Sequence, residues 1–260
     1  MQDSDASRLK SLDRALDLIE TLAGHPHGVS LTIAAKQLGI PKSGAFRVLN
    51  TLEQRGYVVQ DPRTEHYALG PRFLYLALAV ERGSDVRSVA TPFLRALRDE
   101  LNETVYLAVP ANRMMAYIDK FPSTRSLQMS AQVGEHAMLH CTAQGKAYLA
   151  ALDVAQRKQI AESLDYVRRT ERTIQTPDEL LAELERVARR GYAVNDIENE
   201  PEVRCVGAAV RDRSGAPVAG VSVSGAAANM NRQRVALVGK RCREVAEEIS
   251  SALGGGRALG

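Results

Sequence analysis

The feature that most constrains the fold is a run of three short helical patterns before Gly56, with a tight turn between the second and the third. The first helix is predicted by apolar residues that recur at three- and four-residue steps and stop at Gly24. These residues are Leu9, Leu12, Leu16, Ile19 and Leu22. A second helix is predicted over residues 31–38, with Ser30 as its N-cap and Gly39 at its C-terminal end. A third is predicted over residues 41–55, because Pro41 suits a first helical turn.

A pair of short strands is predicted after the third helix. Residues 57–60 and 66–69 have strand composition and flank a loop rich in turn-forming residues. Three helices with a tight turn between the second and third, followed by a β-hairpin, form a winged helix-turn-helix. We expect the third helix to face the core with Phe46, Leu49 and Leu52.

The opposite face of the third helix carries the chemistry of a DNA-recognition helix. Arginine, lysine, serine and asparagine suit phosphates and base edges. The candidate DNA-binding residues are Lys42, Ser43, Gly44, Arg47 and Asn50 on this helix, with Ser30, Thr32 and Arg63 outside it. A winged helix used only for protein contacts is the alternative. The net charge of +3 permits DNA binding without requiring it, so the order of the elements favours DNA.

The rest of the chain predicts a linker and a larger domain, since 260 residues exceed one typical domain. Residues 72–84 read as an apolar linker helix that would bury itself in a dimer. We therefore expect a DNA-binding domain over residues 1–71, an effector domain over 85–254 and a disordered tail over 255–260.

The larger domain is predicted to be α+β, with an antiparallel sheet flanked by helices. Strands are expected at residues 104–109, 114–119, 126–131, 192–195, 205–211 and 218–224. Helices are expected at residues 86–101, 142–151, 177–190 and 231–253.

Two features of this domain suggest a ligand site. The strands at 205–211 and 218–224 should pair as a hairpin, one face of which carries only small side chains. These are Cys205, Gly207, Ala209, Gly220, Ser222 and Ser224. The helix that follows His140 would start at a Thr142 cap and offer the amides of Ala143 and Gln144 to a carboxylate. A helix packed closely on small residues, and an ordinary capped helix, are the respective alternatives.

Several other functions are disfavoured. The polar start of the chain does not resemble a signal peptide, and the longest apolar run, at residues 73–80, is too short to span a bilayer. Three widely spaced cysteines suit a reducing cytoplasm. The sequence indicates no metal or other cofactor, because His136 and His140 lack a third ligand at a fixed spacing. The rival function is a small-molecule enzyme that uses the C-terminal pocket, with the winged helix as an interaction module, but no catalytic constellation stands out, and Cys205 is better explained as a buried thiol than as a nucleophile.

The motifs together resemble the IclR family of bacterial transcriptional regulators over essentially the whole chain. In the N-terminal part they are SLDRALDLI (residues 11–19), PKS (41–43), LEQRGY (52–57) and YALG (67–70). In the C-terminal part they are LHCTAQGKA (139–147), RGY (190–192), EPEVRC (200–205) and SVSG (222–225).

The resemblance implies a GAF-like effector domain, dimers or tetramers, and palindromic operators in double-stranded DNA. It also implies an effector pocket beside the start of the helix at Thr142 and the two paired strands, where the free amides and the small-residue face suggest a small organic acid, with aromatic acids among the candidates. Its residues would be Ala143, Gln144, Cys205, Ser222 and Ser224, with Met129, Ala137 and Val203 as apolar lining. Asn195 is the ninth candidate and stands where many relatives have an acidic residue, and some relatives have a small residue where Gln144 stands; both differences alter the pocket's charge or size.

Overall fold

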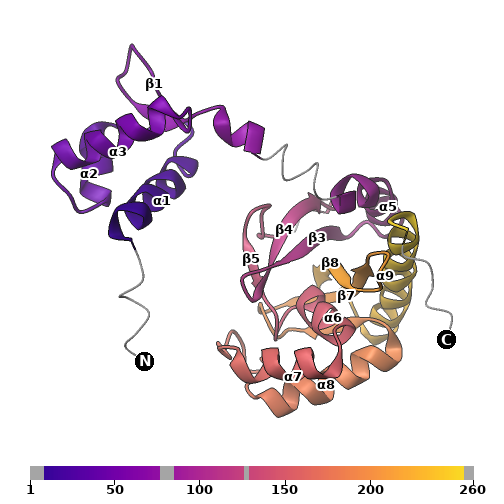
Figure 1. Ribbon diagram of the computed structural model, residues 1–260. Helices are drawn as coiled ribbons and strands as arrows, with labels where there is room; N and C mark the ends of the chain where they lie inside the picture. The colour runs from indigo at the N-terminus through magenta and orange to yellow at the C-terminus, as the bar shows by residue number, and fades with distance from the viewer. Residues whose placement is uncertain (1–8, 77–84, 126–128, 255–260) are drawn as a thin grey trace. The chain divides into compact units, whose positions relative to one another are not determined.

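The computed structural model describes residues 9–76, 85–125 and 129–254. The chain divides into two compact units, residues 1–83 and 84–260, and each has its own hydrophobic core. Both are visible in Figure 1.

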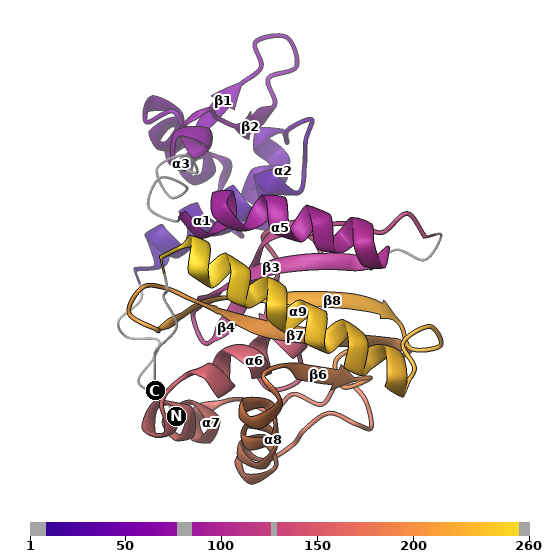
Figure 2. The same cartoon turned by 90° about the vertical axis from the view of Figure 1, so that its right-hand side faces the viewer.

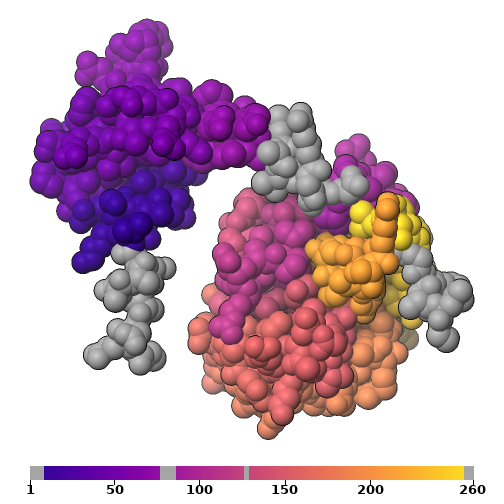
Figure 3. Space-filling model, viewed as in Figure 1, coloured from indigo at the N-terminus to yellow at the C-terminus, as the bar shows by residue number. Residues whose placement is uncertain are grey.

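The N-terminal unit is a winged helix-turn-helix, as predicted. Its helices are α1 (Lys10–Ala23), α2 (Leu31–Gln37) and α3 (Lys42–Gln54), followed by the antiparallel strands β1 (Val58–Gln60) and β2 (Tyr67–Leu69). The Ser30 hydroxyl caps α2 by accepting a hydrogen bond from the Ile33 amide at 3.3 Å. The loop between β1 and β2 stands out from the helices as a lobe (Figure 3).

The three helices close around a small core that includes Leu18, Leu22 and Leu49. Gly28 lets the chain enter α2 close to the hairpin: its φ is +73°, and a Cβ there would lie 2.7 Å from the Tyr67 carbonyl oxygen. Val29 consequently forms a bridge with Tyr67 that ties the helices to the hairpin. After the hairpin, residues 72–76 are helical, and the rest of the expected linker helix lies outside the described residues.

The C-terminal unit contains a six-stranded antiparallel sheet in the order β5-β4-β3-β8-β7-β6. The strands are β3 (Thr104–Ala111), β4 (Met114–Phe121), β5 (His136–Met138), β6 (Ala193–Asp196), β7 (Val203–Arg211) and β8 (Pro217–Ala226). The helices described in this unit are α5 (Asp85–Leu101), α6 (Ala143–Ala151), α7 (Val154–Ser163), α8 (Pro177–Arg190) and α9 (Arg232–Ala252).

Helices cover both faces of the sheet (Figures 1 and 2). On one face α5 and α9 pack against the valines of β7 and β8, including Val206, Val221 and Val223. On the other face α6, α7 and α8 form a second core with Ala108 and Met115. The alternation in β7 and β8 thus sends valines to one face and small residues to the other, and the α+β class is confirmed.

The structure corrects two sequence-based expectations in this unit. No strand forms at residues 129–131, and the other half of the strand expected at 126–131 lies outside the described residues. The strand beside β4 is instead β5, which pairs with β4 beyond a turn at Gly134, where φ is +93°. Helix α7, which the sequence analysis missed, begins where the Asp153 carboxylate accepts a hydrogen bond from the Gln156 amide at 2.8 Å.

Candidate functional site

The outward face of α3 is a polar, cationic surface. Lys42, Ser43, Arg47 and Asn50 are exposed, and Gly44 is half-buried. Neither Lys42 nor Arg47 forms an ion pair with a described residue, so both positive charges remain available to phosphates or bases. The helix is held from behind by Ala45, Leu49 and Leu52, which are buried.

Phe46 corrects the expected orientation of α3. The sequence predicts this residue on the core face, but Phe46 is 50% exposed. Ala45, Leu49 and Leu52 follow each other at steps of four and three residues and fill the core face. Phe46 is rotated by about 100° from Ala45 and consequently lies on the outward side.

The other candidate DNA-binding residues lie outside α3. Thr32 is exposed in the first turn of α2, whereas Ser30 is half-buried and its hydroxyl is engaged as the α2 cap. Arg63 is exposed in the hairpin loop, where its amide donates to the Asp61 carboxylate at 2.7 Å. These positions suit phosphate contacts from the helix start and from the wing.

The small-residue face of β7 and β8 receives the N-terminal turn of α6. A Cβ on Gly207 would lie 2.8 Å from the Gln144 amide nitrogen, and one on Gly220 would lie 2.8 Å from the Gln144 Cβ. Close helix packing therefore accounts for this part of the face. Further along the same strands, the face borders a cavity.

The cavity measures about 30 Å³ and lies between the sheet, the start of α6 and two loops. Seven of the nine candidate effector residues line it: Met129, Ala143, Gln144, Asn195, Val203, Cys205 and Ser224. Ala137 and Ser222 do not line it: Ala137 packs into the core beneath α6, and Ser222 is buried in β8.

Sequence reasoning missed several lining residues, among them Tyr106, Tyr117, Asn199 and Glu200. The rings of Tyr106 and Tyr117 have centroids 4.9 Å apart and form an aromatic wall. Tyr106 pairs in register with Ser222 and therefore lies on the same face of the sheet as the small residues. The alternation of side chains in residues 104–109 could have indicated this position from the sequence.

Hydrogen-bond donors without partners converge on this cavity. Gln144 is 3% exposed, and its side-chain nitrogen forms no well-aligned hydrogen bond with a described residue, although the side chain interacts with the Tyr117 hydroxyl. The Thr142 hydroxyl accepts from the Gly145 amide at 3.3 Å, and no described residue accepts a hydrogen bond from the amides of Ala143 and Gln144 at the positive end of α6. Buried donors of this kind favour a ligand that brings acceptor oxygens.

A thiol and a carboxylate side chain also line the cavity. Burial raises the pKa of the Cys205 thiol to about 12, although a hydrogen bond with Ser224 opposes this rise. The thiol is therefore protonated at neutral pH and is a poor nucleophile. Glu200 is the one charged side chain among the described lining residues, and it faces a cavity whose other polar groups are neutral.

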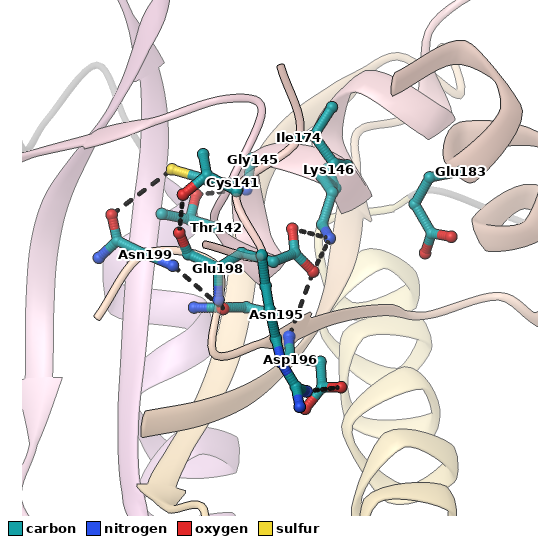
Figure 4. A network of polar contacts seen from close by, with 12 residues as sticks. Cys141, Thr142, Gly145, Lys146, Ile174, Glu183, Asn195, Asp196, Glu198 and Asn199 are labelled. Atoms are coloured by element: carbon teal, nitrogen blue, oxygen red, sulfur yellow. Dashed lines mark hydrogen bonds and ion pairs between the residues drawn. The ribbon is translucent and has the colours of Figure 1, made fainter. Parts of the chain in front are cut away.

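A buried ion pair holds the loop that forms one wall of the cavity (Figure 4). Lys146 Nζ lies 2.6 Å and 2.5 Å from the two carboxylate oxygens of Glu198. The exposed fractions of the two side chains are 1% and 10%. Burial raises the pKa of Glu198, and the Lys146 ammonium group opposes that rise.

The same loop is fixed by the Asn195 side chain. Its carbonyl oxygen accepts from the Glu198 amide at 2.7 Å and from the Asn199 amide at 3.4 Å. Ile197, between these residues, has φ of +62°, which costs a non-glycine residue about 1–3 kcal/mol. The ion pair and the asparagine together stabilise this strained wall.

None of the helices in the described part of the chain combines the length and apolar character that a membrane crossing requires. Over the same residues, no group of three or more histidine, cysteine, aspartate or glutamate side chains could hold a metal ion.

A winged helix-turn-helix followed by a larger α+β domain is an architecture typical of DNA-binding regulators. Residues 11–62 match the IclR helix-turn-helix domain, and residues 78–251 match the C-terminal domain of bacterial IclR transcriptional regulators. The chain belongs to the IclR family of transcriptional regulators.

Individual relatives agree with this assignment. The transcriptional repressor IclR of Escherichia coli is 31% identical over 252 residues, which cover 96% of this chain and 92% of the relative. The crystal structure of Thermotoga maritima IclR is 31% identical, with a TM-score of 0.81 over 95% of this chain and 100% of that one. An IclR homologue from Microbacterium hydrocarbonoxydans, complexed with 4-hydroxybenzoate, has the same fold at 22% identity, with a TM-score of 0.80 over 95% and 100% of the two chains.

Proposed function

We propose that this regulator binds palindromic operators as a homodimer or homotetramer in the cytoplasm, and that a small organic acid in the C-terminal cavity changes its operator affinity. The observation that carries the effector assignment is the convergence of unpartnered donors on the cavity. The Gln144 side-chain nitrogen and the free amides at the start of α6 suit a carboxylate.

The shape of the cavity supports an acid with an apolar body. The two tyrosine rings and Met129 provide apolar walls, while Ser224 and Asn195 add polar groups. The homologue that binds 4-hydroxybenzoate shows that the fold can accommodate an aromatic acid. At about 30 Å³ the cavity has to widen first, since a benzene-sized ligand occupies a cavity of about 150 Å³.

DNA binding is assigned to α3 with contributions from Ser30, Thr32 and Arg63. A two-fold symmetric oligomer presents two such helices to successive major grooves, which is why we propose a palindromic operator. We infer that the C-terminal domain senses and does not catalyse, because the protonated Cys205 thiol is a poor nucleophile.

The operator assignment is tested by footprinting the full chain on the DNA upstream of its own gene. We expect protection of an imperfect palindrome, with an affinity that falls steeply as salt rises, because phosphate contacts release counterions. An affinity that does not change with salt concentration, or no binding to genomic fragments, would refute the assignment.

The effector assignment is tested by thermal unfolding of the full chain with a panel of carboxylic acids. A ligand at a hundredfold excess over its Kd adds about 2.7 kcal/mol to the stability of the folded state. We expect at least one acid to raise the melting temperature and to change operator binding in the same concentration range. A panel in which no acid does both argues against an organic-acid effector.

A further inference from the structure

Phe46 differs from the other phenylalanines of the chain in being exposed. Phe121 is buried, Phe93 packs against the main core, and Phe73 packs edge-on against Tyr57 at 5.3 Å. Phe46 is 50% exposed. Other residues of α3 form its contacts with the core of the N-terminal unit, and Phe46 is not among them.

The position of Phe46 on α3 places it at the flank of the cationic face, next to Lys42, Ser43 and Asn50. Lys42 and Ser43 precede it by four and three residues, and Asn50 follows it by four, so all four side chains share one side of the helix. Arg47 is the next residue along the chain. An apolar ring thus lies beside the groups assigned above to phosphates and base edges.

The chemistry of the ring limits what it can contact in DNA. A phenyl group offers nothing to a phosphate, whereas thymine presents a C5-methyl group in the major groove that phenylalanine can contact. We propose that Phe46 packs against a thymine methyl group in each half-site and so selects thymine at one operator position. This inference rests on the proposed operator binding by α3.

The test is a methyl-deletion scan of the footprinted operator. Each thymine in turn is replaced by deoxyuridine, which removes the methyl group and leaves every base-pair hydrogen bond in place. For the wild type we expect one position per half-site at which affinity falls about fourfold, the fold-change that corresponds to ~0.8 kcal/mol for one buried methyl group. Phe46→Ala should bind the thymine and deoxyuridine operators equally well, with an unchanged salt dependence.

Three further variants control the test. Arg47→Ala should bind more weakly but keep the fourfold ratio, because it removes a different contact. Val59→Ala truncates another exposed apolar side chain, 42% exposed on β1, and should also keep the ratio. Phe46→Leu retains an apolar contact and should keep part of the fourfold ratio between the thymine and deoxyuridine operators.

The outcomes distinguish a failure of the proposed Phe46 contact from a failure of the proposed DNA binding. A wild type that binds its operator but shows no methyl-sensitive position, or a Phe46→Ala variant that keeps the full ratio, overturns the role of Phe46. A wild type that binds no operator at all overturns the proposed DNA binding instead. Since Phe46 is half exposed, Phe46→Ala should melt close to the wild-type temperature, which checks that the fold is intact.

Discussion

Breaking the buried ion pair between Lys146 and Glu198 should destabilise the protein. The loss of stability has an upper limit, because a side chain left without its partner can become neutral by losing or gaining a proton. Glu198→Gln leaves a lysine that is 1% exposed without its counter-ion. The stranded group can escape by losing its proton, and neutralising an ordinary lysine at pH 7 costs about 4.6 kcal/mol. In Lys146→Met the glutamate must be protonated instead, which for an ordinary glutamate costs about 3.7 kcal/mol at pH 7.

The two variants should respond to pH in opposite directions. In Glu198→Gln the folded state binds fewer protons than the unfolded state, so the loss of stability should shrink as pH rises. In Lys146→Met the folded state keeps a proton on the glutamate that the unfolded state releases, so the loss should shrink as pH falls. Calorimetric unfolding of the full chain between pH 5 and pH 9 measures both trends.

Two comparisons sharpen this test. The double variant Lys146→Met/Glu198→Leu buries no charge and should recover most of the stability lost in either single variant. Glu162→Gln removes a pair with Lys158 whose side chains are 65% and 56% exposed, and it should change stability by about 0.5 kcal/mol or less. Single variants that lose under 1 kcal/mol at pH 7, or lose the same amount at every pH, would refute the reasoning.

Three other changes have defined outcomes. Arg47→Ala should weaken operator binding by ~1–3 kcal/mol if it makes a bidentate contact with guanine, and a gel shift equal to wild type would exclude this role. Leu74, 71% exposed in the helical segment after the hairpin, should bury its side chain in the oligomer, so Leu74→Asp should sediment as a smaller species or aggregate. Ser224→Ala should reduce the thermal shift produced by the effector more than Ser222→Ala does, because only the first serine lines the cavity; equal effects would contradict the assigned site.

The sequence predicts most of the architecture, because the patterns behind it are local. Helix α2 is specified by its Ser30 cap, and the other N-terminal elements are bounded by turn residues within one segment, although the core of α1 is formed by Leu18 and Leu22 and not by the expected Leu9, Leu12 and Leu16. Helix α7 was missed since its apolar residues form no clear stripe, and β5 was missed because three residues give too short an alternation. Phe46 was misplaced because its three-residue step to Leu49 also fits a core face, and only packing shows that Ala45 occupies that face.

The cavity was predictable only in part. The small residues of β7 and β8 indicate it, since alternation fixes which side chains share a face. The wall containing Asn195 and Glu198 depends on an ion pair between residues 52 positions apart, and no local pattern indicates such a pairing. Tyr117 likewise reaches the cavity through the pairing of β4 with β3, which the sequence does not specify.

The small volume of the cavity has a kinetic consequence. One wall is held by the buried Lys146–Glu198 pair, whereas the segment at 129–131 is held by two side-chain hydrogen bonds, from Lys120 Nζ to the Met129 carbonyl at 2.9 Å and from the Tyr106 hydroxyl to the Ala131 carbonyl at 3.3 Å. An effector larger than a few water molecules can enter only after a wall has opened, so its observed association rate should level off at the opening rate as its concentration rises. A pulse of effector shorter than the mean opening time should therefore load only a fraction of the molecules.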